Sequence, residues 1–177
     1  TKRRIAAPPI RRAFRKMRVC AAQFLMKPVR DWEQFAAGVE FFVDVAREYH
    51  SHMLLLPELF AVQLFSTMKP DLDPKQAMLQ LAETADRYVE LLRAMASRDQ
   101  LYIVGGSHPV LRDGNLYNVA HIFTPVGNVY TQDKLHITPG EREVWGIRPG
   151  SGLKLFETPF CRFGVQVCYD IEFPEVS

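Results

Sequence analysis

Apolar residues follow two patterns along this chain, short continuous runs and longer stretches that repeat every three to four positions. The continuous runs cover residues 17–24, 53–56 and 101–105, and their length and near-complete apolarity predict buried strands. The repeating stretches cover residues 31–50, where Asp31 can cap the first turn, and 74–98, where Pro74 stands at the start, so they predict helices. The alternating order predicts an α/β fold with helices covering a largely buried sheet.

Turn signals divide the second half of the chain into shorter segments. Asp113-Gly114 and residues 125–128 predict two tight turns, which would bound strands over 115–124 and 129–133. Residues 105–107, Gly-Gly-Ser, predict a turn after the preceding strand. The remaining predicted segments are loops over residues 59–73 and 135–152, strands over 153–157 and 162–168, and a helix start at Pro174.

Composition describes a globular chain rather than a membrane or disulfide-rich one. The chain has 177 residues, 47% of them hydrophobic, and no apolar run near the roughly 20 residues that span a bilayer. Three cysteines without paired spacing argue against a disulfide framework and favour a reducing, cytoplasmic location. Cys20 and Cys161 lie in apolar settings and are interpreted as packing thiols.

The net charge of +2 conceals an uneven distribution. Residues 1–18 contain eight Lys and Arg and no acid, which leaves 14 basic and 20 acidic residues, a net charge of −6, on the rest of the chain. An acidic body gives no support to a nucleic-acid partner. We interpret residues 1–16 as a basic linker or N-terminal arm and residues 17–177 as the start of one domain.

Three chemically reactive side chains stand at the ends of predicted strands: Glu58, Lys134 and Cys168. A thiol can attack a carbonyl carbon, a carboxylate can accept its proton, and an ammonium can lower the thiol pKa and stabilise an oxyanion. The backbone N–H of Tyr169 would assist at the oxyanion. Alone, each residue is more often structural, but together they predict cleavage of an amide through a thioester, with water activated by Glu58.

The segments 54–60, 134–142 and 167–175 resemble the motifs of the nitrilase superfamily of carbon–nitrogen hydrolases. The resemblance implies a four-layer α-β-β-α sandwich, here extending only as far as the strand that carries the cysteine. It also implies that Glu58 is the general base, Lys134 the catalytic lysine and Cys168 the nucleophile. Glu141 would be the second glutamate that positions the lysine, in preference to Glu143. The resemblance implies no metal and no organic cofactor. It also implies that the protein forms a homodimer or a larger assembly.

The details of these motifs favour an amide over a nitrile as substrate. Tyr169 and Asp170 follow the cysteine as in the amidase-like branches, although the segment 141–146, with Trp145 as a candidate pocket wall, is similar to true nitrilases. Glu172 stands where an arginine is common, which would favour a neutral or cationic amide if it lines the pocket. The pattern also resembles a branch in which an acetyltransferase-like (GNAT) domain precedes the hydrolase.

Two other classes of function stay open on the sequence. The chain can be a non-catalytic piece of a larger protein, because a buried strand near position 177 needs further elements to cover it. It can also be an interaction module whose basic residues 1–18 dock on an acidic partner, in which case function would survive the loss of Cys168.

Overall fold

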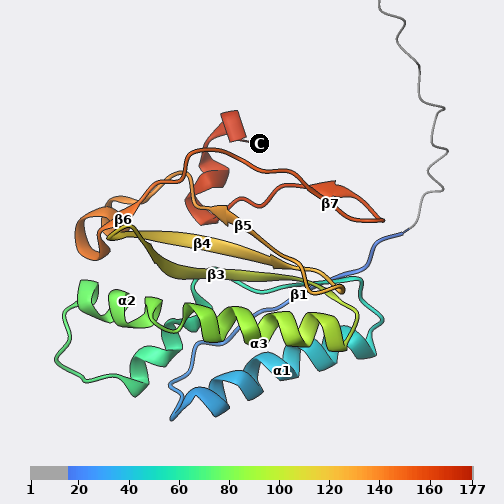
Figure 1. Ribbon diagram of the computed structural model, residues 1–177, viewed down its shortest axis with the longest axis horizontal. Helices are drawn as coiled ribbons and strands as arrows, with labels where there is room; N and C mark the ends of the chain where they lie inside the picture. Colours follow the sequence, from blue (N-terminus) through green and yellow to red (C-terminus); the bar gives the residue numbers. More distant parts are fainter. Residues whose placement is uncertain (1–15, 177) are drawn as a thin grey trace, which may run out of the picture.

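The computed structural model describes residues 16–176, and its centre is a six-stranded mixed sheet (Figure 1). The order is β1-β2-β3-β4-β5, with β6 also paired to β4. The β1–β2, β2–β3 and β4–β6 pairs are parallel, and β3–β4 and β4–β5 are antiparallel. The strands are β1 (Val19–Ala21), β2 (Met53–Leu55), β3 (Tyr102–Arg112), β4 (Asn115–Phe123), β5 (Val129–Asp133) and β6 (Ile147–Arg148).

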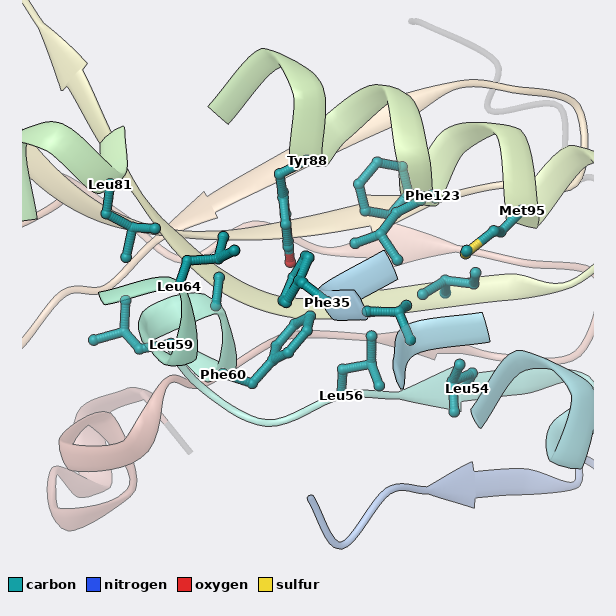
Figure 2. Close-up of a cluster of buried hydrophobic side chains, with 14 of the residues drawn as sticks. Phe35, Leu54, Leu56, Leu59, Phe60, Leu64, Leu81, Tyr88, Met95 and Phe123 are labelled. Carbon is teal, nitrogen blue, oxygen red and sulfur yellow. The ribbon is translucent and has the colours of Figure 1, made fainter. Parts of the chain in front are cut away.

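Helices lie along one face of this sheet (Figure 1): α1 (Trp32–Glu48), α2 (Pro74–Ala82) and α3 (Ala85–Arg98). Asp31 caps α1 as predicted, since its side chain accepts a hydrogen bond from the backbone N–H of Gln34 at 2.7 Å. Apolar residues at helical spacing in α1 and α3 meet the buried face of β2 and β3, and Figure 2 shows their side chains interlocking. The central residues of this core include Phe35, Leu54, Phe60, Leu81, Tyr88 and Phe123.

The single helix predicted over residues 74–98 is wrong in one respect, because it is broken at Glu83-Thr84. The backbone N–H groups of both residues bond to carbonyls three positions back, which tightens and ends α2. The Thr84 hydroxyl also donates to the carbonyl of Leu81 at 2.8 Å. The apolar repeat continues through the break because both helices pack on the same core, so it gave no sign of the break.

The turn predicted at residues 105–107 is also wrong, since β3 continues through it. The pairing with β4 shifts register between Val104 and Ser107, and Gly106 has a φ of +66°. A glycine in the left-handed region allows a bulge that keeps the strand going. A Cβ on Gly106 would lie 2.0 Å from the carbonyl oxygen of Pro57. Because glycine has no side chain, the segment that leads to Glu58 can pack directly against the bulge.

The opposite face of the sheet carries a smaller layer. A two-stranded hairpin, β7 (Phe156–Glu157) with β8 (Arg162–Phe163), packs over Met53, Val104 and Ile122. The strands predicted over 153–157 and 162–168 are therefore shorter than expected, because residues 164–167 have no ladder partner among residues 16–176. Helices, sheet and hairpin form the α-β-β side of the predicted sandwich (Figure 1).

Short helical turns replace parts of the predicted loops. They are the 3₁₀ helix η1 (Phe60–Thr67), one π-helical turn η2 (Glu141–Trp145), and the 3₁₀ helices η3 (Cys168–Glu172) and η4 (Pro174–Val176). The basic arm predicted for residues 1–16 lies, except for Lys16, outside the described residues. Within residues 16–176, none of the helices combines the length and apolarity that crossing a bilayer requires.

Candidate active site

Glu58 is presented at the end of β2 by a strained but well-supported turn. Pro57 ends the strand, and Leu59 adopts a left-handed φ of 47°. The backbone N–H of Leu59 donates to the buried hydroxyl of Ser107 at 3.2 Å, which fixes the turn against the bulge of β3. The Glu58 side chain is 25% exposed, so its carboxylate has one side toward the sheet and one toward solvent.

Lys134 lies directly after β5, and its ammonium sits between two carboxylates. The side chain is only 1% exposed, and Nζ donates to Glu58 Oε1 at 2.8 Å and to both oxygens of Glu141 at 2.8 and 2.9 Å. Glu141 begins the π-helical turn, where Thr138 gives it two further hydrogen bonds through its N–H and hydroxyl. The structure therefore places Glu141, rather than the exposed Glu143, on the lysine.

The ammonium and the carboxylates of this group stabilise one another's charged forms. Burial alone would lower the pKa of Lys134, but hydrogen bonds to Glu141 and Glu58 outweigh it, so the pKa is raised and the ammonium stays protonated. Burial likewise opposes ionisation of Glu141, but bonds from Lys134 and Thr138 leave its pKa below the usual value. An ammonium and carboxylate in this arrangement are stable only as a set.

Asn118 completes this set, and none of the motifs pointed to it. Its side chain on β4 is fully buried, and Nδ2 donates to Glu58 Oε1 at 2.8 Å and to Glu141 Oε1 at 3.2 Å. Its backbone carbonyl accepts from the N–H of Lys134 at 2.9 Å. A polar residue within the buried strand 115–123 was the available signal. We refer to Glu58, Asn118, Lys134 and Glu141 as the lysine cluster.

Cys168 lies at the first position of η3, in a turn that we call the cysteine turn (residues 167–172). It has a φ of 50°, a left-handed conformation that a residue with a side chain adopts at a cost. Cys168 and Glu58 both line a pocket of about 310 Å³ over the face of the sheet opposite the helices. Apart from Ser107 and Gln166, the other side chains around this pocket are apolar, among them Leu55, Val104 and Val167.

The environment of the thiol differs from expectation. Partial burial raises the pKa of Cys168, and the negative charge of Glu58, with a hydrogen bond to it, raises the pKa further. Lys134 lowers the pKa as expected, but its effect is outweighed because two carboxylates surround its single charge. The predicted direction of the Lys134 effect is therefore confirmed, but the net shift of the thiol pKa is upward. A raised pKa favours the protonated thiol, and the Glu58 carboxylate lies beside it.

The remaining predicted site residues lie at different distances from this centre. Tyr169 is 36% exposed and packs edge-on against Phe173, with ring centroids 5.1 Å apart. Glu172 is exposed on the outer end of η3 and does not line the pocket that Cys168 and Glu58 share. Trp145 is half-buried against the main core, which fits an anchor for its loop. Among residues 16–176, no three His, Cys, Asp or Glu side chains are grouped to hold a metal ion.

Comparison with known proteins assigns the class. Residues 18–177 match the family model described as carbon–nitrogen hydrolase, and the chain belongs to this family. It is similar to a probable hydrolase, YhcX, of Bacillus subtilis, with 39% identity over 91% of this chain and 31% of that protein. It is also similar to the omega-amidase NIT2 of Xenopus tropicalis, with 30% identity over 92% of this chain and 58% of that protein. The chain thus spans less than a third of the first relative and less than three fifths of the second.

Solved structures agree on the fold. An amidase from Nesterenkonia sp. matches with a TM-score of 0.73 and 24% identity, over 90% of this chain and 58% of that one. A carbon–nitrogen hydrolase from Helicobacter pylori G27 matches with a TM-score of 0.75 and 22% identity, over 90% and 54%. The nitrilase-type α/β fold expected from the sequence is therefore confirmed.

Proposed function

We propose that this chain carries the reactive centre of an amidohydrolase that cleaves a small amide through a thioester on Cys168. The observation that supports the proposal most strongly is the lysine cluster, in which one ammonium bonds two carboxylates, with one of those carboxylates beside a thiol. The proposed base, Glu58, and the proposed nucleophile, Cys168, line one pocket, and the proposed cation, Lys134, is buried behind Glu58 and bonded to it.

The acylation step uses the neutral thiol found at rest. As Cys168 Sγ attacks the amide carbonyl carbon, its proton moves to the Glu58 carboxylate, so no free thiolate has to accumulate. The new oxyanion is stabilised by the ammonium of Lys134 and the backbone N–H of Tyr169. The carbon–nitrogen bond then breaks, Glu58 returns the proton to the nitrogen, and ammonia or an amine leaves a thioester.

The second step reverses these roles with water. Glu58, now ionised again, takes a proton from water while the hydroxide attacks the thioester carbonyl. Collapse of that second oxyanion expels the Cys168 sulfur, which recovers the proton from Glu58, and releases the acid. Glu141 and Asn118 keep Lys134 directed toward Glu58 throughout, since they hold the ammonium and both carboxylates in one network.

An amide is favoured over a nitrile by two observations. Tyr169-Asp170 after the cysteine is typical of the amidase-like branches, and relatives with names such as omega-amidase match nearly the full chain. The mostly apolar lining of the pocket fits a small uncharged acyl group. We further propose that the protein works in the cytoplasm as a homodimer or larger assembly.

The test is ammonia release from a panel of small aliphatic amides, including dicarboxylate monoamides, by the wild-type chain and by Cys168→Ala. We expect the variant to lose on the order of 10⁴-fold in kcat, because removal of a nucleophile eliminates the covalent route. Cys161→Ala is the matched control and should keep full activity, since Cys161 contacts Met17 and neither residue lines the pocket.

Three outcomes would count against the proposal. Turnover that survives in Cys168→Ala would exclude the thioester. Release of ammonia from nitriles but not from amides would assign the chain to the nitrile-hydrolysing members of the family. A folded, cooperatively melting wild-type chain that hydrolyses neither would support the non-catalytic alternative.

A further inference from the structure

A second buried carboxylate, outside the lysine cluster, joins the two parts of the site. Asp170 is 1% exposed, and its Oδ1 accepts from the backbone N–H groups of His136 at 2.7 Å and Leu135 at 3.1 Å. Its Oδ2 accepts from the backbone N–H of Val167 at 3.0 Å. The first two peptides directly follow the site lysine, and the third directly precedes the site cysteine. One side chain thus holds both segments.

The ring of His136 strengthens this connection. Its Nδ1 lies 3.1 Å from Asp170 Oδ1, and its ring stacks on Phe173 with centroids 3.6 Å apart and an interplanar angle of 7°. Phe173 is the residue that ends η3, and its N–H bonds to the carbonyl of Asp170. The loop after the lysine therefore contacts both ends of the cysteine turn.

The arrangement requires a carboxylate rather than an amide. Both oxygens of Asp170 face backbone N–H donors, so an asparagine here would direct its NH₂ group at one of them. A buried carboxylate is tolerated only with such donors, and hydrogen bonds to an ionised acceptor are stronger than neutral ones. The left-handed conformation of Cys168 needs support of this kind, because strained backbone persists only where its surroundings hold it.

We propose that Asp170 is a positioning residue that fixes the distance between the Cys168 thiol and the Glu58–Lys134 pair. It does not touch substrate, and it acts through the backbone on either side. The expected effect on turnover rests on the function proposed above, but the effect on the thiol does not.

The experiment follows the thiol and the turnover separately in Asp170→Asn. Labelling of Cys168 by iodoacetamide is measured by intact mass across pH 6–10, and amide hydrolysis is measured in parallel. The charged groups that act on the thiol are Glu58, Lys134 and Glu141, and together they raise its pKa. If Asp170 positions the thiol among them, the variant's labelling profile shifts to lower pH, toward that of an ordinary thiol.

The expected result is opposite changes in two rates. Labelling of Cys168 near neutral pH becomes faster in Asp170→Asn, whereas kcat falls by about 100-fold with little change in KM, because a misplaced group costs rate more than binding. A merely structural role would not produce this combination. Asp73→Asn is the matched control: Asp73 also accepts two backbone N–H groups, at the start of α2, but it does not line the pocket that Cys168 and Glu58 share.

Unfolding must be separated from misplacement, since both expose thiols. Labelling of Cys20 and Cys161 in the same spectra reports unfolding, and a faster rate confined to Cys168 supports the proposal. If Asp170→Asn does not fold, His136→Asn retains both backbone bonds to Asp170 and should show the same shift at smaller amplitude. An unchanged labelling profile and unchanged kcat in a folded variant would overturn the proposal. A shifted profile in a chain that hydrolyses no amide would keep it and overturn the proposed function instead.

Discussion

The lysine cluster and the cysteine turn are built in contrasting ways, although they line one site. The lysine cluster lies on or beside β2, β4 and β5, is largely buried, and satisfies its charges internally. The cysteine turn lies outside the central sheet, exposes its thiol, and has a left-handed residue at its start. The contrast indicates that the charged groups are fixed by the sheet, while the thiol of Cys168 is held by a few specific contacts.

Removal of the central charge should have the largest effect on stability. Lys134→Met keeps most of the side-chain volume but leaves two partly buried carboxylates facing each other. We expect a loss of about 3–5 kcal/mol in the free energy of unfolding, the usual cost of breaking a buried pair on one side. Urea denaturation followed by circular dichroism measures it.

A second substitution checks the cause. Lys134→Met combined with Glu141→Gln removes one of the stranded charges, so it should be more stable than Lys134→Met alone. If the double variant is less stable by the sum of the two single effects, the charges of the lysine cluster do not stabilise one another. The lysine cluster would then not differ from the cysteine turn in this respect.

The second-largest effect should be a loss of folding stability in acid, caused by two buried histidines of the sheet. Burial lowers the pKa of both His108 and His121 to about 4, below the ordinary 6.5, so the unfolded chain binds protons that the folded chain does not. A folded pKa below the unfolded one gives stability that is complete above pH 6.5 and is lost as the pH falls toward 4. We expect the two together to remove about 3–4 kcal/mol between pH 7 and 5.

Urea midpoints at the two pH values measure this loss, and His121→Gln is the comparison variant. It should retain a smaller part of the pH dependence, because one of the two imidazoles is gone. A pH dependence of the same size in the variant would show that other groups, such as surface carboxylates, dominate acid unfolding.

The smallest effect concerns the cysteine turn itself. Cys168→Gly removes a side chain from a residue with a φ of 50°, where glycine has no steric penalty. We expect the stability to stay within about 1 kcal/mol of wild type and to exceed that of Cys168→Ala, which retains a Cβ. Thermal melts of the two variants side by side suffice. A less stable glycine variant would mean that the turn relaxes when the thiol is absent.

The residues of the candidate site were easier to predict from the sequence than the residue that holds its segments in place. Glu58, Lys134 and Glu141 were predicted from motifs and positions at strand ends, and the structure brings them into hydrogen-bond contact. Asp170 was recognised only as part of the motif after the cysteine, with no role of its own. Two of its partners are backbone N–H groups more than 30 residues away, and such groups look the same in every sequence.

The fold shows the same division. The central strands and α1 were predicted because apolar runs and a capping aspartate are local signals. The bulge at Gly106 and the break before α3 were not, because a Gly-Gly pair resembles a turn and the apolar repeat of residues 74–98 is uninterrupted. β7 and β8 are shorter than predicted because a strand extends only where a neighbouring strand pairs with it. A strand's own residues do not specify that neighbour.

The carboxylate beside Cys168 also has a consequence for the chemistry of oxidation. Peroxide attacks the thiolate form of cysteine, and an exposed thiol with a lowered pKa is the one most readily converted to sulfenic acid. Cys168 is exposed, but Glu58 and burial raise its pKa, so at neutral pH it is almost entirely the protonated, slowly oxidised form. The carboxylate that we propose as the proton acceptor would thus also protect the sulfur between turnovers.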